Sequence, residues 1–130
     1  MVTIEQQKPV LELHLEHELW IKELLFWKDE IAVMEKYLAQ VNAWLNTQES
    51  KAGVEHFQNQ FILHNEVIDV LKKDVKTHEK FIALQAEDNP VAIDRVHFDD
   101  HTGLRERMDT QRNIYSELKM EYFGFLSHNM

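Results

Sequence analysis

The 130-residue chain contains no cysteine. This absence excludes disulfide bonds, thiolate zinc sites, iron–sulfur clusters and cysteine nucleophiles. Only three glycines and two prolines occur, which is too few for a glycine-rich phosphate loop. Basic residues are also scarce, with 14 lysines and arginines against 23 aspartates and glutamates. The resulting net charge of −9 argues against nucleic acid as a partner.

Membrane and export signals are missing as well. No apolar run approaches the roughly 20 residues that span a bilayer, and the start MVTIEQQKPV has no basic segment followed by an apolar one. We therefore expect a soluble, cytoplasmic protein. The serines form no nucleophile arrangement, so the sequence favours a non-enzymatic role, with metal-dependent chemistry as the remaining route to catalysis.

Two short segments divide the chain into three parts of similar length. NTQESKAG (46–53) contains Ser50, which can cap a helix, and AEDNP (86–90) ends in a proline that cannot continue one. The parts between them are rich in Glu, Leu, Lys, Ala and Gln, a composition typical of helices. The sequence predicts one domain, residues 1–130, with helices over 9–46, 51–87 and 92–128.

In each part, a series of mostly apolar residues recurs in alternating steps of four and three, which is a heptad pattern. We call each series a seam, because it lies along one face of its helix. The first seam runs from Leu13 to Leu45, the second from Val54 to Ile82 and the third from Asp94 to Phe125. Such seams are typical of helices that cross at about 20°. The predicted fold is therefore all-α, an antiparallel up-down-up bundle of three long helices.

Histidines are concentrated on these seams. The five seam histidines are His17, His64, His78, His97 and His101. Because a seam takes about two positions in seven, chance would place about two or three of the eight histidines there. If the chain reverses direction at 46–53 and again at 86–90, four of these histidines, all except His64, lie at one end of the bundle. Asp94 lies one heptad before His101 on the same seam.

These side chains together suggest a metal site. Neutral imidazole is a common ligand for zinc and iron, and each uncompensated buried polar group costs roughly 1–3 kcal/mol. The predicted ligands are His17, His78, His97, His101 and Asp94, around an iron or zinc ion. Asp74, Glu79 and Asp100 are expected to orient the ligands. The alternative is an acidic helical interaction or scaffold protein without metal, whose histidines form a polar bundle end.

The HFDDH stretch contains an HxxxH pair, His97 and His101, one helical turn apart. Together with histidines from two other helices, this pair resembles part of the hemerythrin-type arrangement of histidines and carboxylates. The resemblance is confined to this residue pattern, because the family's HxxxxD and HxxxE elements do not follow in the family's order. It indicates a class of chemistry and no family membership.

His64 on the second seam and Gln111 on the third are expected at the same height along the bundle, about two heptads from the histidine cluster. A buried, hydrogen-bonded polar layer of this kind fixes the register of packed helices. We therefore predict such a layer, with a second ligand-binding site as the alternative.

The first predicted helix carries additional apolar residues outside its seam. This helix-one stripe consists of Leu19, Phe26 and Val33, with Leu11, Leu25, Ala32 and Ala39 alongside. On a lone three-helix bundle it would face water, and exposed stripes of this extent mark partner surfaces. We expect a homodimer, or a larger homo-oligomer, that pairs first helices across a two-fold axis. Alternatively, the first helix is central and is covered on more sides.

Overall fold

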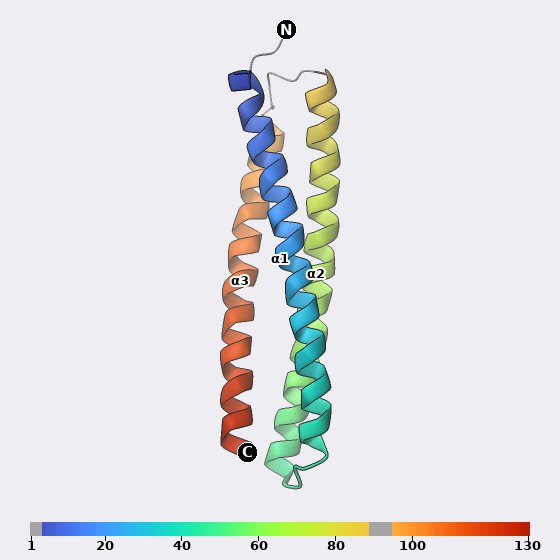
Figure 1. Ribbon diagram of the computed structural model, residues 1–130, viewed down its shortest axis with the longest axis vertical. Helices are drawn as coiled ribbons and strands as arrows, with labels where there is room; N and C mark the ends of the chain where they lie inside the picture. The colour runs from blue at the N-terminus through green and yellow to red at the C-terminus, as the bar shows by residue number, and fades with distance from the viewer. Residues whose placement is uncertain (1–3, 89–94) are drawn as a thin grey trace.

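Three long α-helices make up the computed structural model. It describes residues 4–88 and 95–130, without the side chains of 4–9, 86, 88 and 95–97. Helix α1 spans Ile4–Asn42, α2 spans Gln48–Asp88 and α3 spans Arg95–Asn129. No strand occurs among the described residues, so the all-α prediction is confirmed. Figure 1 shows an elongated rod in which the start of α1 and the end of α3 lie at opposite ends.

Contacts between α1 and α2 establish that these helices run in opposite directions. Near the first turn, the Lys51 ammonium donates to the carbonyl oxygen of Asn42 at 2.8 Å. Toward the other end of the rod, His17 of α1 contacts Glu79 of α2. Low residue numbers in α1 therefore face high residue numbers in α2, as Figure 1 also shows.

A ladder of ion pairs joins α1 to α3. Acidic residues at every seventh position of α1 meet basic residues at every seventh position of α3. The pairs are Glu16 with Arg105 at 2.5 Å, Glu23 with Arg112 at 2.7 Å and Glu30 with Lys119 at 2.9 Å. Each pair joins residues 89 positions apart, so α1 and α3 run parallel in one register. Single exposed pairs stabilise little, but this ladder places Glu16 at the histidine-rich end.

Helix ends differ from the sequence prediction by a few residues. Helix α1 begins at Ile4 rather than residue 9, which puts Pro9 in the second turn, and it ends at Asn42 rather than 46. Helix α2 begins three residues before the predicted start at residue 51. The expected cap at Ser50 is wrong, because the Ser50 backbone N–H donates to Thr47 Oγ1 at 3.1 Å. Thr47 thus caps α2, in the residue class that helix N-termini prefer.

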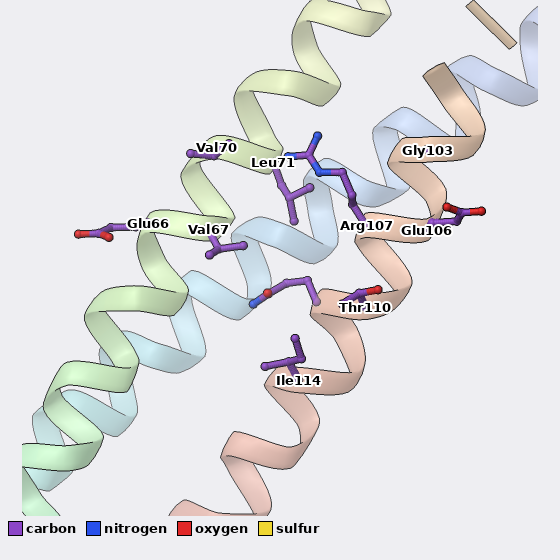
Figure 2. A pocket seen from close by; sticks show the side chains of 10 residues that line it. Glu66, Val67, Val70, Leu71, Gly103, Glu106, Arg107, Thr110 and Ile114 are labelled. Carbon is purple, nitrogen blue, oxygen red and sulfur yellow. The ribbon is translucent and has the colours of Figure 1, made fainter. Parts of the chain in front are cut away.

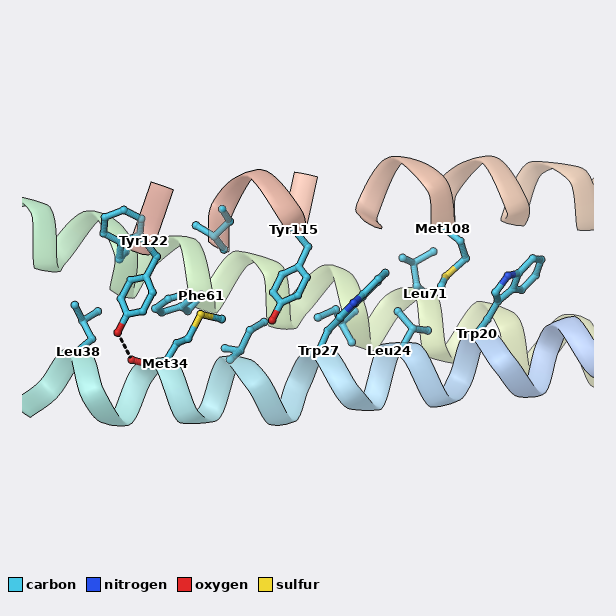
Figure 3. Close-up of a cluster of buried hydrophobic side chains, with 14 of the residues drawn as sticks. Trp20, Leu24, Trp27, Met34, Leu38, Phe61, Leu71, Met108, Tyr115 and Tyr122 are labelled. Carbon is cyan, nitrogen blue, oxygen red and sulfur yellow. Dashed lines mark hydrogen bonds between the residues drawn. The ribbon is translucent and has the colours of Figure 1, made fainter. Parts of the chain in front are cut away.

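The hydrophobic core follows the predicted seams. Every seam residue whose side chain is described is buried, except Leu45 and Phe125, which are half-buried. Figure 3 shows these side chains meeting between the helices, with the Tyr122 hydroxyl donating to the carbonyl oxygen of Met34 at 2.9 Å. Among the described residues, no helix is long and apolar enough to cross a membrane.

Gly53 of α2 permits the close approach of Phe125 of α3. A β-carbon added at Gly53 would overlap the ring of Phe125, whereas one added at Gly124 would meet nothing within 4 Å. Gly124→Ala should therefore raise the free energy of unfolding by about 1 kcal/mol through helix propensity. Gly53→Ala should instead lower the free energy of unfolding below that of the parent protein, because the Phe125 ring must move to make room for the new methyl group. Urea unfolding followed by circular dichroism compares the two variants, and equal gains would contradict this packing.

Candidate metal centre

One histidine from each helix lies at the same level of the bundle. His17, His78 and His101 are 2%, 5% and 2% exposed. One ring nitrogen from each lies within 4.8 Å of the other two. The ring centroids are 5.0 Å apart for His17 and His101, 5.1 Å for His17 and His78, and 5.5 Å for His78 and His101. The structure thus brings together three of the four histidines expected from the sequence, and we call them the inner trio.

Two further predicted ligands lie outside the described residues, Asp94 entirely and His97 in its side chain. Of the three carboxylates expected to orient ligands, only one contacts the inner trio. Asp74 of α2 instead accepts a hydrogen bond from the Arg107 guanidinium of α3 at 2.9 Å, so its carboxylate is directed toward α3 and away from the trio. Asp100 is exposed on α3. Glu79 remains as the predicted carboxylate that reaches a trio histidine.

Glu79 bridges two histidines of α1. One carboxylate oxygen accepts from His14 Nδ1 and the other accepts from His17 Nδ1. Because an ionised carboxylate has no hydrogen to give, each ring must carry its proton on Nδ1. This contact fixes the orientation of the His17 ring and directs its Nε2 toward the centre of the bundle.

Glu16 plays the same part for His101. Its Oε1 accepts from His101 Nε2 at 2.9 Å. Arg105 holds the carboxylate through Nε at 3.1 Å and Nη2 at 2.5 Å, and this contact lowers the pKa of Glu16. Burial lowers the pKa of His101, which the hydrogen bond to Glu16 opposes. The Glu16 carboxylate therefore stays ionised and keeps the His101 proton on Nε2.

Sequence reasoning missed Glu16, because it considered seam positions and acidic residues near the predicted turns. The signal that would have found it is the charge ladder. Acidic residues seven apart in α1 and basic residues seven apart in α3 indicate neighbouring helices that pair along their edges, and in the predicted up-down-up bundle these two helices run parallel. The first rung puts Glu16 directly beside His17 in sequence and beside His101 in space.

The two oriented rings face each other. His17 Nε2 and His101 Nδ1 are 3.2 Å apart. Trp20 stacks on the His101 ring with a centroid separation of 4.9 Å and an interplanar angle of 24°. These apolar and aromatic surroundings keep bulk water from the facing nitrogens and strengthen any charge interaction between them.

A second group of potential ligands shares His17. His14, His17 and Glu79 each offer one atom within 4.8 Å of the others. Unlike the inner trio, this group is partly open, since the side chains of His14 and Glu79 are 32% and 36% exposed. A groove of about 650 Å³ between α1 and α2 is lined by the same three residues.

The other predicted polar layer is present. His64 and Gln111 are buried, and the Gln111 amide donates to His64 Nδ1 at 2.9 Å. A groove of about 750 Å³ between α2 and α3 lies over Gln111, with Val67 and Val70 on one wall and Ile114 on the other. Figure 2 shows these walls. The His64–Gln111 hydrogen bond ties the two helices together at this level, which supports the role in helix register.

Buried His64 makes stability depend on pH. Burial lowers the pKa of His64 from its ordinary value of 6.5, so the folded protein resists protonation of this ring. The unfolded chain takes the proton first, and the contribution of neutral His64 is therefore present above about pH 6.5 and lost as pH falls toward the folded-state pKa. We expect the free energy of unfolding to fall across this interval, with a slope of at most about 1.4 kcal/mol per pH unit from this group.

Urea unfolding at about pH 7.5 and about pH 5.5 tests this dependence. His64→Gln keeps a hydrogen-bonding side chain opposite Gln111 but cannot titrate, so its loss of stability should be smaller. His56→Gln, at an exposed position of the same helix, is the matched control. An equal loss in the parent protein and in His64→Gln would contradict the assignment.

The hemerythrin-type resemblance depends on the pair His97 and His101, and the side chain of His97 lies outside the described residues. Glu16 and Glu79 contact imidazole rings, and in the described part of the chain each trio histidine comes from a different helix. The inner trio is thus a three-helix assembly in which carboxylates orient rings. No protein-family model, no curated protein and no solved structure matches this chain.

Proposed function

We propose that this protein is a metal-binding up-down-up helical bundle in which His17, His78 and His101 hold one divalent cation. His97 and Asp94, whose side chains lie outside the described part of the chain, remain proposed additional ligands. Glu79 and Glu16 orient two of the rings, as carboxylates do in many metal sites. The role is binding, sensing or metal-dependent chemistry, and no particular reaction is assigned.

The observation that carries this proposal is the pair of facing nitrogens. With the proton of His17 on Nδ1 and that of His101 on Nε2, each neutral ring has one lone pair, and the two lone pairs point at each other across 3.2 Å. Neither can donate to the other. A cation between them accepts both lone pairs. Two nitrogens bound at 2.0–2.1 Å to a tetrahedral zinc ion lie about 3.3 Å apart, close to the observed separation.

The donor set favours zinc over iron. The inner trio supplies three imidazole nitrogens, a ligand set found in zinc sites that keep a fourth position for water or another ligand. Non-haem iron sites commonly combine two histidines with a carboxylate. Here Glu16 and Glu79, described carboxylates that contact the inner trio, are engaged with ring N–H groups. Iron is the second choice, with Asp94 as the carboxylate that would favour it.

Metal content of the protein purified without a histidine tag tests the proposal. Elemental analysis and calorimetric titration with Zn²⁺ should give one zinc per chain. A protein that neither retains nor takes up zinc would support the alternative, an acidic helical scaffold in which one extra proton joins the facing rings. That alternative also satisfies both nitrogens, so metal binding is the measurement that separates the two.

The oligomer is proposed from the helix-one stripe. Leu19, Phe26 and Val33 are 57%, 58% and 53% exposed in the single chain, so the neighbouring helices do not cover them. This exposure argues against α1 as a central, fully covered helix. A second copy that packs its own α1 on this stripe would remove the apolar surface from water.

Phe26→Glu combined with Val33→Glu is expected to give monomers, because charged side chains resist burial at an apolar interface. Sedimentation velocity at micromolar concentration should show a dimer or larger species for the parent protein. Ile62→Glu, at an exposed position of α2, is the control and should leave the assembly unchanged. A monomeric parent protein would rule out the proposed assembly.

A further inference from the structure

His17 belongs to two groups of potential ligands, one on each side of its ring. Its Nε2 faces His101 in the inner trio, and its Nδ1 faces the carboxylate of Glu79, which also contacts His14. The two groups therefore share one imidazole through different nitrogens. No other histidine among the described residues belongs to both groups.

The two groups also differ in access to solvent. All members of the inner trio are at most 5% exposed, so a hydrated cation cannot reach them directly. His14 and Glu79 are about one-third exposed and line the groove between α1 and α2. His17 lines that groove too, whereas His78 and His101 do not. The His17 ring thus stands between the groove and the buried nitrogens.

We infer that His14, His17 and Glu79 form an outer cation site through which Zn²⁺ enters and leaves the inner trio. The inference rests on the proposed zinc-binding function. Zn²⁺ first binds His14 Nδ1, His17 Nδ1 and a Glu79 oxygen at the floor of the groove. It then passes to His17 Nε2, His101 Nδ1 and a ring nitrogen of His78. The mixed nitrogen and oxygen donors of the outer site suit zinc and bind it more weakly than the buried imidazoles.

Proton positions make the two sites mutually exclusive. A neutral imidazole has one lone pair, so His17 can serve only one zinc ion at a time. With zinc in the outer site, His17 carries its proton on Nε2 and donates to His101 Nδ1 across 3.2 Å. With zinc in the inner site, the proton is on Nδ1 and is donated to Glu79. On transfer, His17 moves its proton from Nε2 to Nδ1. His14, which binds zinc through Nδ1 with its proton on Nε2, likewise returns that proton to Nδ1 and donates it to Glu79, so the net charge stays the same.

A competing route exists on the other side of the bundle. The groove between α2 and α3 is lined by His78 with Asp74 and Asp100. Asp74 is occupied by Arg107, and among the described residues this groove holds no group of three ligand atoms within 4.8 Å. Of the two grooves, the α1–α2 groove is therefore the one whose described residues offer a cation a binding site along the route.

Zinc exchange kinetics test the outer site. Stopped-flow mixing with Zn²⁺ measures uptake, and excess EDTA with an indicator dye measures release. In His14→Ala, both rate constants should fall by about tenfold or more. The equilibrium dissociation constant should change by no more than about threefold, because the inner ligands remain. His56→Ala controls for the loss of one exposed histidine, and Asp100→Asn tests the other groove.

Each outcome decides a different point. Failure of the parent protein to bind zinc contradicts the proposed function itself. Zinc binding with unchanged exchange in His14→Ala leaves that function intact and overturns the outer site. A loss of affinity in His14→Ala as large as that in His78→Ala would make His14 a final ligand, which also overturns it. Slow exchange in Asp100→Asn alone would move the route to the α2–α3 groove.

Discussion

Replacing His78 with alanine is expected to weaken zinc binding by at least about a hundredfold, since loss of even an orienting partner costs 10–100-fold. His78 is the trio member contributed by α2, and its ring centroid lies 5.1 Å and 5.5 Å from those of His17 and His101. Its removal leaves two facing nitrogens and no third imidazole from the trio. Calorimetric titration with Zn²⁺ measures the change.

A cysteine at the same position gives a second readout. His78→Cys restores a zinc ligand, and because the parent chain has no cysteine, the new thiolate is the only one present. Zinc affinity should recover relative to His78→Ala, and bound Co²⁺ should show a thiolate charge-transfer band. His56→Ala should bind zinc like the parent protein. Unchanged affinity in His78→Ala would mean that no three-helix site forms and that His97 and His101 are at most a local chelating pair within α3.

The core of the fold was predictable because burial here is encoded locally. A residue such as Leu24 or Phe61 needs only the heptad spacing to be placed on the inner face, and both are 0% exposed. Helix ends were less predictable because competing caps lie close together. Thr47 and Ser50 both belong to the favoured capping class, and the choice between them depends on where α1 stops. That stop is a tight turn in which Trp44 N–H donates to the Val41 carbonyl at 2.9 Å.

The candidate site was predictable in part for a related reason. The height of a residue along the bundle follows from its distance in sequence to the nearest turn. The three histidines of the inner trio could therefore be assigned to the same height from the sequence. The height of two residues along the bundle does not by itself say whether their side chains meet. Glu16 and Arg105 lie off the seams, so their contact is found only by matching the charged residues that recur every seven positions in α1 and α3. The ladder therefore carries information that seam counting does not use.

That ladder also bears on how the site is held. The ion pair between Glu16 and Arg105 holds the Glu16 carboxylate against His101. The ion pair between Glu23 and Arg112 joins the same two helices in the same register, seven residues further along each. A slip of α3 by one turn would break these rungs together and move His101 by about 5.4 Å along the rod. The facing nitrogens of His17 and His101 thus depend on charged residues outside the inner trio.

Zinc is expected to raise the free energy of unfolding, by about 2.7 kcal/mol at a free zinc concentration one hundred times the dissociation constant. The reason is linkage, since the unfolded chain does not hold three distant histidines together. Binding requires unprotonated rings, so the gain should shrink at acidic pH, where protons compete with zinc for the imidazole nitrogens. Thermal unfolding at several zinc concentrations, each at neutral and at mildly acidic pH, measures both effects.

Magnesium separates coordination from simple charge neutralisation. The chain carries a net charge of −9, and any divalent cation reduces the repulsion among its carboxylates. Mg²⁺ prefers oxygen ligands and keeps much of its water, so it should not occupy a site built from His17, His78 and His101. At equal concentration and ionic strength, Mg²⁺ should therefore stabilise the protein far less than Zn²⁺. Equal stabilisation by both cations, unaffected by His78→Ala, would show that carboxylate neutralisation rather than imidazole coordination is responsible.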